Sequence, residues 1–351
     1  MSVANPVIAA PPARSRARRW IGRALRWTAA GVGVLLVGTT VAGRVLHARD
    51  EARWRPPGRL VDVGGRQLHL YCTGTGSPTV VLEAGLGEFS LPAWHSVQPQ
   101  IAACTRVCSY DRAGQGWSDP APEPQLATAM VDDLHALLAG AGERAPFVMV
   151  GHSAGGPLVR HYATHHPEQV VGMVLLDGSH ENQKKLEPIP AWVGWMVRAL
   201  PVVNALGVDR VAASFGAADT ITAIAAARTT RAATVASLVD FWSVFDPWLA
   251  QVGADARPFG DLPLVVITAG KRSTAPGETP EESARSKERW YAMQKDIVSR
   301  STAGRWILVD SSGHHIQHDQ PALVVATVRA QVDAARVVDA TPMAPPASAV
   351  P

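Results

Sequence analysis

The stretch Phe147-Val-Met-Val-Gly-His-Ser-Ala-Gly-Gly-Pro-Leu-Val-Arg160 decides the fold of this chain. It begins with an apolar run typical of a buried strand, and its last residues open a helix. Ser153 lies between them at the apex of a sharp turn, with glycines two positions before it and two positions after it. The glycines let the backbone segments pass closely, so that the serine hydroxyl projects above the strand ends. This setting makes Ser153 a candidate nucleophile.

Short apolar or β-branched runs recur along the chain and alternate with helical stretches. The predicted strands span residues 66–72, 78–83, 105–110, 146–150, 171–177, 262–268 and 305–309, and the predicted helices between and after them include residues 127–139, 155–166 and 321–337. Several strands are apolar throughout, as is typical of strands covered on both faces. The sequence therefore predicts an α/β fold with a mostly parallel central sheet flanked by helices, and with ligands at the carboxyl ends of the strands.

Residues 181–259 interrupt the alternation with an almost wholly helical, Ala- and Val-rich segment. We interpret it as a helical cap inserted over the sheet. Its large apolar residues are Trp192, Trp195, Met196, Phe241, Trp242, Phe245 and Trp248. Most of these side chains are expected to pack inside the cap, and any that face the site would form an apolar pocket.

A serine hydroxyl is a poor nucleophile until a base takes its proton. His314 follows Gly313 in the loop after the last predicted strand, so His314 is the candidate base, with His315 and His318 as alternatives. The base in turn needs an acid to orient its imidazole ring.

Asp177 ends the predicted strand 171–177 and is the preferred candidate acid. The alternatives are Asp246, Glu181 and Glu278. The next predicted strand, residues 262–268, is followed by no carboxylate before Glu278.

Two backbone N–H groups can stabilise the negative charge that develops on a tetrahedral intermediate. We expect these donors to be the amides of Ala154, after the candidate nucleophile, and of Leu86, in the Gly-rich loop after residues 78–83. A phosphate cradle is the competing interpretation of Gly85-x-Gly87, but no P-loop lysine follows it.

The formal charge of +3 is unevenly distributed, because residues 1–49 hold eight Arg and no acid. The rest of the chain carries more acidic than basic residues, which argues against a nucleic-acid partner.

Residues 27–43 are uncharged and reach the lower limit of about 17 residues for a membrane span. Six Arg precede them, so the positive-inside rule places the N-terminus in the cytoplasm and the body outside it.

We therefore predict a basic, disordered cytoplasmic segment over residues 1–26, a transmembrane helix or signal anchor over 27–46, and a linker over 47–57. The folded domain is predicted over 58–338, and a disordered tail over 339–351. A cleaved signal peptide, which would release a secreted protein, is the alternative to an anchor, since Thr40-Val-Ala42 fits a cleavage site.

The spacing of the Cys and His residues predicts no metal site, and no cofactor is expected.

With these residues identified, residues 58–337 resemble the α/β-hydrolase superfamily, in particular its small esterase-like and peptidase-like members with a helical cap. The matching stretches are Pro78-Thr-Val-Val-Leu-Glu-Ala-Gly-Leu-Gly87, Tyr110-Asp-Arg-Ala-Gly-Gln-Gly-Trp-Ser-Asp119, Gly151-His-Ser-Ala-Gly-Gly156 and Ser312-Gly-His-His-Ile-Gln-His-Asp-Gln-Pro321. The resemblance implies that Asp111 and Arg112 support the wall of the active site. It also implies neighbouring strands for Cys72 and Cys108, and hence a disulfide between them.

Two departures from the superfamily pattern bear on the site. Ala84 stands where many members have a histidine in the oxyanion loop. Lys271 and Arg272 follow the penultimate strand, where members usually carry the acid, and some members carry it one strand earlier, which favours Asp177.

Together these features predict a serine hydrolase that cleaves an ester or amide bond of a small apolar substrate through an acyl-serine intermediate. An aminopeptidase or amidase of the same fold and a non-catalytic, membrane-tethered binding protein are the alternatives.

Overall fold

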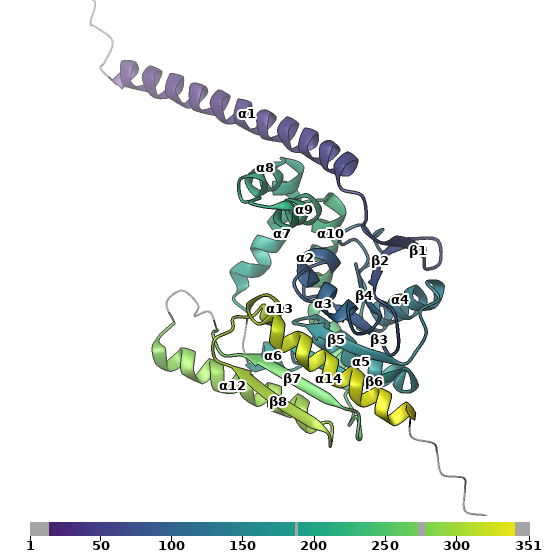
Figure 1. Cartoon of the computed structure of the whole chain (residues 1–351). Coiled ribbons are helices and arrows are strands. Elements are labelled where there is room, and N and C mark those ends of the chain that lie inside the picture. The colour runs from purple at the N-terminus through teal and green to yellow at the C-terminus, as the bar shows by residue number, and fades with distance from the viewer. Residues whose placement is uncertain (1–13, 187–188, 273–277, 341–351) are drawn as a thin grey trace, which may run out of the picture.

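The computed structural model describes residues 14–186, 189–272 and 278–340 and places one eight-stranded sheet at their centre (Figure 1). The strands lie in the order β1-β2-β4-β3-β5-β6-β7-β8. Their bounds are β1 Arg59–Asp62, β2 Gln67–Thr73, β3 Thr79–Glu83, β4 Val107–Tyr110, β5 Phe147–His152, β6 Val170–Leu176, β7 Leu264–Ala269 and β8 Gly304–Val309. Pairing is antiparallel from β1 to β4 and parallel from β4 to β8.

The predicted fold class is confirmed, and all seven predicted strands are present. The sequence pattern missed only β1, because a single one of its four residues, Val61, is buried and so leaves no apolar pattern to detect.

Helices cover both faces of the sheet. On one face lie α4 (Ala127–Gly140), α5 (Gly155–His165) and α12 (Pro280–Ser299); on the other lie α2 (Ser90–Trp94), α3 (Gln98–Ala102), α13 (Ile316–Asp319) and α14 (Pro321–Ala340). Each face of the sheet has its own apolar core, and successive residues of a strand point into opposite cores. In β3, Val81 packs toward α4 and α5, whereas Val80 and Leu82 pack toward α3 and α14. Burial on both faces explains the continuous apolar runs of the central strands.

The cap consists of helices within the predicted range of 181–259 that lie between β6 and β7. They are α6 Gln183–Leu186, α7 Ala191–Ala205, α8 Val208–Phe215, α9 Thr220–Thr229, α10 Ala232–Ser243 and α11 Phe245–Ala254. Phe241, Phe245 and Trp248 belong to a buried apolar cluster against which Leu86, of the loop after β3, also packs. Trp192 and Trp195 differ from the expected internal packing, because α7 turns them outward.

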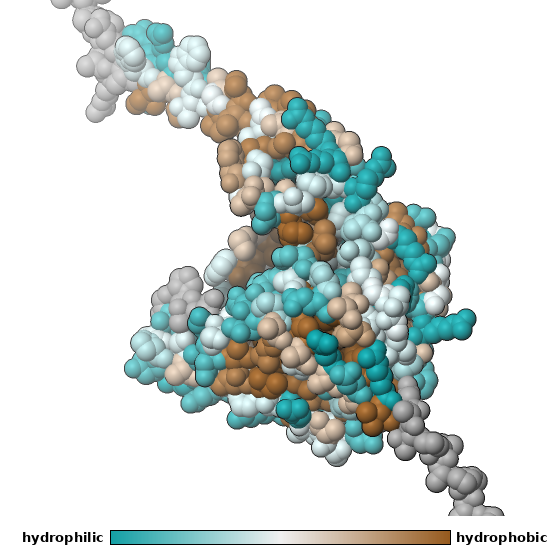
Figure 2. Space-filling model, in the orientation of Figure 1, coloured by the Kyte–Doolittle hydropathy of each residue, from teal (hydrophilic) through white to brown (hydrophobic). Residues whose placement is uncertain are grey.

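Helix α1 spans Arg14–Arg53 and projects from the rest of the molecule, with hydrophobic residues exposed along it (Figures 1 and 2). Residues 18–53 form the one helix in the described part of the chain that is long and apolar enough by itself to cross a membrane. Such a helix near an N-terminus is typical of an anchor and of a signal sequence alike.

The carboxyl-terminal end of α1 differs from the predicted linker over 47–57, because it continues as helix to Arg53 and docks on the cap. Asp50 forms a buried ion pair with Arg210 of α8 at 2.7 Å, and Gly43 lies so close to Gly207 that a Cβ atom there would meet its Cα at 2.7 Å. Residues 14–26, predicted to be disordered, are helical as well. Residues 1–13 and 341–351 of the predicted disordered ends lie outside the described residues.

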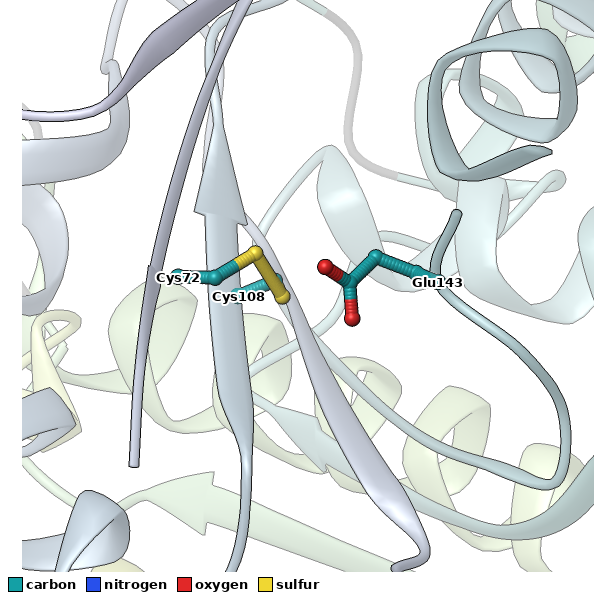
Figure 3. Close-up of side chains that lie close together, drawn as sticks. All are labelled: Cys72, Cys108 and Glu143. Carbon is teal, nitrogen blue, oxygen red and sulfur yellow. A yellow bond between two sulfur atoms is a disulfide. The ribbon is translucent and has the colours of Figure 1, made fainter. Parts of the chain in front are cut away.

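Cys72 of β2 and Cys108 of β4 face each other in register and form a disulfide, as the resemblance implied (Figure 3). Glu143, which also lies beside them, accepts two hydrogen bonds from Arg106 at 2.6 Å. The remaining cysteine, Cys104, is a free thiol in contact with the carbonyl of Ile101.

Candidate active site

Ser153 lies at the turn from β5 to α5 in a left-handed backbone conformation, with φ of 52°. The neighbouring glycines make this turn possible: a Cβ atom on Gly151 would lie 2.6 Å from the carbonyl oxygen of Gly155, and one on Gly155 would lie 2.5 Å from that of Glu83. The carbonyl of Ser153 accepts hydrogen bonds from the amides of Gly156 and Ser179. The turn is therefore held rigidly in a conformation that costs a non-glycine residue of order 1–3 kcal/mol.

Asp177 and His314 come together at the carboxyl end of the sheet, with 2.7 Å between Asp177 Oδ2 and His314 Nδ1. The second carboxylate oxygen of Asp177 accepts hydrogen bonds from Trp290 Nε1 at 2.8 Å and from the amide of Ala269 at 3.2 Å. Asp177 is 2% exposed and, like Ser153, has a positive φ, of 43°. Three donors thus fix the orientation of this carboxylate.

His152 connects the serine turn to the loop that carries His314. Its Nε2 atom lies 3.0 Å from the carbonyl oxygen of His314, and its ring lies 4.7 Å from the His314 ring, centroid to centroid. His152 directly precedes Ser153, so this contact brings the loop that carries His314 next to the β5–α5 turn.

Glu88, which the sequence analysis missed, lies at the centre of the same contacts. Its carboxylate accepts a hydrogen bond from the Gly85 amide at 2.8 Å and pairs with His152 Nδ1 at 2.9 Å and His315 Nε2 at 2.8 Å. Burial acts to raise the pKa of Glu88, but the hydrogen bonds from the two imidazoles outweigh it and lower the pKa well below its usual value. Glu88 therefore ties the loop after β3 to the other two segments of the site. A lone acid in a loop shows no sequence pattern that reveals this role.

The two expected oxyanion donors lie on segments that are held in place by neighbouring residues. Arg112 donates to the carbonyl oxygens of Ala84 and Gly85, directly before Leu86. Ala154 follows Ser153 in the turn. Neither the Leu86 nor the Ala154 amide has a hydrogen-bond acceptor within the ranges that the structure describes, so both remain available for a substrate oxygen.

Two of the alternative residues are engaged elsewhere. Asp246 is 66% exposed at its side chain and pairs with Lys184. His318 Nδ1 contacts Ser96 Oγ at 3.1 Å. Glu278 borders residues 273–277, which lie outside the described ranges.

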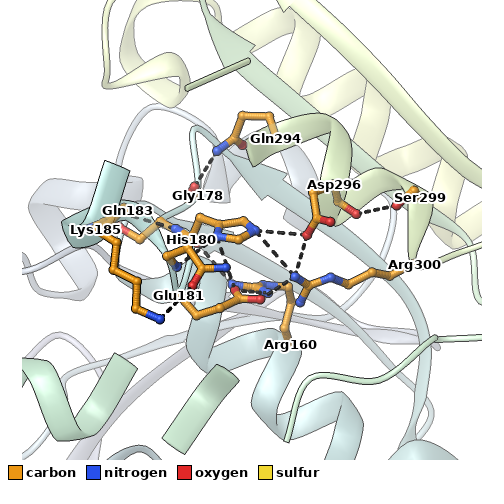
Figure 4. Close-up of polar contacts among 12 residues, drawn as sticks. Arg160, Gly178, His180, Glu181, Gln183, Lys185, Gln294, Asp296, Ser299 and Arg300 are labelled. Atoms are coloured by element: carbon orange, nitrogen blue, oxygen red, sulfur yellow. Dashed lines mark hydrogen bonds and ion pairs between the residues drawn. The ribbon is translucent and has the colours of Figure 1, made fainter. Parts of the chain in front are cut away.

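Glu181 belongs to a network of ion pairs directly after the Asp177 turn (Figure 4). Its carboxylate pairs with Arg160 at 3.0 Å and with Arg300, which also pairs with Asp296 at 2.6 Å. Burial acts to raise the pKa of Glu181, but Arg160 and the neighbouring cations outweigh it and lower the pKa to about 2. With both guanidinium groups on its carboxylate, Glu181 anchors the segment that follows Asp177 and does not reach His314.

Known proteins support this architecture. Residues 78–215 match the family model described as alpha/beta hydrolase fold. Among curated relatives, the probable transporter efuK of Hormonema carpetanum is 33% identical over 43% of this chain and only 23% of its own length. The uncharacterized protein YqjL of Bacillus subtilis is 25% identical over 72% of this chain and 82% of its own. The 2-hydroxymuconate semialdehyde hydrolase of a Pseudomonas species is 31% identical over 34% of this chain and 42% of its own.

Solved structures show the same fold. An esterase from Thermogutta terrifontis has a TM-score of 0.56 at 18% identity, and the epoxide hydrolase CorEH has a TM-score of 0.57 at 16% identity. Each match covers 79% of this chain and 98% of the other. Similarity at this level concerns the fold and does not distinguish between the two reactions. From the strand order, the serine turn and these matches, we conclude that the chain has the α/β-hydrolase fold and that residues 78–215 match the family of that name.

Proposed function

We propose that this protein is a serine hydrolase that cleaves an ester bond of a small apolar substrate through an acyl-Ser153 intermediate. The observation that carries the proposal is the 2.7 Å contact between Asp177 and His314, on a loop that His152 holds beside the Ser153 turn. A buried carboxylate on Nδ1 leaves Nε2 of the ring as the proton acceptor.

In the proposed reaction, Ser153 Oγ attacks the carbonyl carbon of the ester while His314 Nε2 takes the serine proton. The amides of Leu86 and Ala154 stabilise the negative charge on the carbonyl oxygen. When the tetrahedral intermediate collapses, the bond to the alcohol breaks and His314 returns the proton to the alcohol oxygen. Water then attacks the acyl carbon while His314 takes its proton, the bond to Ser153 Oγ breaks, and His314 returns the proton to Oγ as the carboxylic acid leaves. The carboxylate of Asp177 stabilises the imidazolium in both steps.

The expected substrate class rests on the cap. The cluster of Phe241, Phe245 and Trp248 contacts Leu86, so an apolar surface adjoins the proposed oxyanion site. An amide substrate, as in an aminopeptidase, would use the same residues and is the nearest alternative. A serine at the turn, in place of a carboxylate, argues against epoxide-hydrolase chemistry, in which a carboxylate attacks carbon.

Labelling with a fluorophosphonate probe tests the enzyme against the non-catalytic binding protein. We expect the full-length chain in detergent to be labelled at one serine and the Ser153→Ala variant to lose the label, because the probe reacts only with an activated serine. Ser179→Ala, which leaves the proposed triad in place, is the control and should be labelled like the wild type. Hydrolysis of p-nitrophenyl esters of increasing chain length, compared with the matching anilides, then separates esterase from amidase. Folded wild type without a label would exclude the proposed function.

We further propose that α1 is a retained anchor that holds the catalytic domain outside the cytoplasm. Thr40 Oγ1 lies 3.3 Å from the carbonyl oxygen of Leu206, and Asp50 pairs with Arg210, so the helix has partners in the cap on both sides of the predicted cleavage site. Helix α8 packs against α1, and its Phe215 is 86% exposed, so an apolar side chain is uncovered on the helix that contacts the proposed anchor. The Cys72–Cys108 disulfide fits an oxidising compartment.

Carbonate extraction of membranes from cells that express the full chain tests the anchor. We expect the protein to stay in the membrane pellet and its N-terminal region to be intact by mass spectrometry, because about 17 uncharged residues suffice to span the bilayer. A soluble form that begins near Gly43 would instead establish signal cleavage.

A further inference from the structure

A second cluster of polar side chains lies at the end of α5 farthest from the serine turn. His161 and His165 lie one helical turn apart on α5, and Asp255 caps the carboxyl end of α11 in the cap. One donor atom from each residue falls within 4.8 Å of the other two. At a rise of about 1.5 Å per residue, His165 lies roughly 15 Å along α5 from its start at the Ser153 turn, so the cluster is outside the proposed active site.

The Nδ1 atom of His161 makes this cluster unusual. His161 is 2% exposed, and Nδ1 is buried without a hydrogen-bond partner among the described residues. A buried polar atom of this kind costs about 1–3 kcal/mol unless something binds it. Asp255 Oδ2 lies 3.7 Å from this nitrogen, which is too long for a hydrogen bond. The other ring nitrogen, Nε2, lies 3.1 Å from Thr128 Oγ1.

The two distances from Asp255 Oδ2 to the histidine nitrogens are close to those in a tetrahedral metal site. Two ligands on zinc at about 2.0–2.1 Å, at the tetrahedral angle, lie about 3.3 Å apart. Asp255 Oδ2 lies 3.7 Å from His161 Nδ1 and 3.4 Å from His165 Nε2. Thr128 Oγ1 is placed to accept a hydrogen bond from the N–H at Nε2 of His161. Metal-bound histidines commonly donate such a hydrogen bond from the ring nitrogen that does not bind the metal.

We propose that His161 Nδ1, His165 Nε2 and Asp255 Oδ2 bind one divalent cation of the zinc type, with water at a fourth position. Two imidazoles and one carboxylate suit zinc and its neighbours among the transition metals better than calcium or magnesium, which prefer oxygen ligands.

Two other groups of potential ligands in the described residues do not fit a cation. Cys72 and Cys108, which lie beside Glu143, are consumed by their disulfide. The second group consists of His180, Glu181 and Asp296. Its two carboxylates already form ion pairs with the guanidinium groups of Arg160 and Arg300 (Figure 4). In the cluster around His161, by contrast, no arginine forms an ion pair with Asp255 among the described residues.

The bound cation would tie the cap to the main domain, because two of its ligands lie on α5 and the third follows α11. Binding to the folded state alone stabilises that state by mass action. The thermal unfolding midpoint should therefore rise with zinc concentration, although the cation takes no part in ester cleavage. This proposal departs from the sequence analysis, which predicted no metal.

Zinc binding to the tag-free, full-length chain in detergent, after removal of metals with EDTA, tests the site. We expect equilibrium dialysis to show one Zn²⁺ bound per chain, and Co²⁺ to produce the visible absorption bands of a tetrahedral site. His165→Ala and Asp255→Asn should each weaken zinc binding by at least about a hundredfold, as losing a ligand costs more than losing an outer contact. Both side chains are about one-third exposed, at 34% and 35%, so the variants should fold.

His166→Ala is the matched control, because it removes a neighbouring histidine that stacks on His135 and keeps all three ligands. This variant should bind zinc like the wild type, and all three variants should retain fluorophosphonate labelling. Absence of zinc binding by the folded wild type, or unchanged affinity in both His165→Ala and Asp255→Asn, would overturn the proposal.

Discussion

Replacement of His314 by alanine is expected to lower kcat for ester hydrolysis by about 10⁴- to 10⁶-fold, because removing the base of a serine triad costs nearly as much as removing the whole triad. The ring is oriented by Asp177 at 2.7 Å, and its loop is held by His152 at 3.0 Å. Without the imidazole, Ser153 keeps its proton at neutral pH and the serine oxygen is a weak nucleophile. KM should change far less than kcat, since the imidazole acts on the transition state.

Two neighbouring histidines provide the controls, His315→Ala and His318→Ala. Glu88 hydrogen-bonds to His315 Nε2 at 2.8 Å and thereby raises the pKa of that imidazole, so this ring nitrogen is already engaged by Glu88. His318 contacts Ser96. We expect both variants to lose no more than about 100-fold in activity, as is usual for residues that act only through their neighbours, far less than the loss in His314→Ala. A His315→Ala variant as inactive as His314→Ala would refute the assignment of the base.

Asp177→Asn is expected to lower kcat by about 10⁴-fold while leaving the fold intact, as the equivalent change does in other serine triads. The asparagine amide has the size of the carboxylate and keeps an oxygen for Trp290 Nε1 and the Ala269 amide. It cannot stabilise the imidazolium of His314, and its NH₂ group favours the wrong tautomer of the ring. Steady-state kinetics on one ester substrate, with circular dichroism to verify folding, measures the effect.

Asp246→Asn is the matched control for the acid. Asp246 is exposed and pairs with Lys184 at the surface of the cap, and an ion pair of this kind contributes no more than about 1 kcal/mol. Its loss should leave kcat unchanged. Near-wild-type turnover in Asp177→Asn, or a large loss in Asp246→Asn, would contradict the proposed triad.

The sequence predicted most of the sheet because the central strands are buried on both faces and therefore read as continuous apolar runs. It predicted the Ser153 turn for a related reason: strand, glycines and helix are adjacent in the chain, so local geometry alone requires this arrangement. The third member of the proposed triad could not be decided in the same way. Asp177 is separated from His314 by 137 residues. The residues next to Asp177 in the sequence do not distinguish it clearly from the other candidate acids.

Helix α1 shows that amino-acid composition alone does not predict where a helix ends. Its apolar segment was visible in the sequence, but residues 47–53 are polar enough to resemble a linker. They are helical in the structure, where Asp50 meets Arg210 in a buried ion pair. A charged residue that finds its partner 160 positions away in the chain shows no local sign of burial.

The sequence by itself thus determined the α/β fold and the place of the candidate nucleophile, because both depend on patterns within a few consecutive residues. The tertiary structure alone decided which acid meets His314, how Glu88 joins the three segments of the site, and that His161, His165 and Asp255 converge on one point. These arrangements depend on contacts between strands, helices and cap that lie far apart in the chain. Only packing of the folded core brings such residues within a few ångströms of one another.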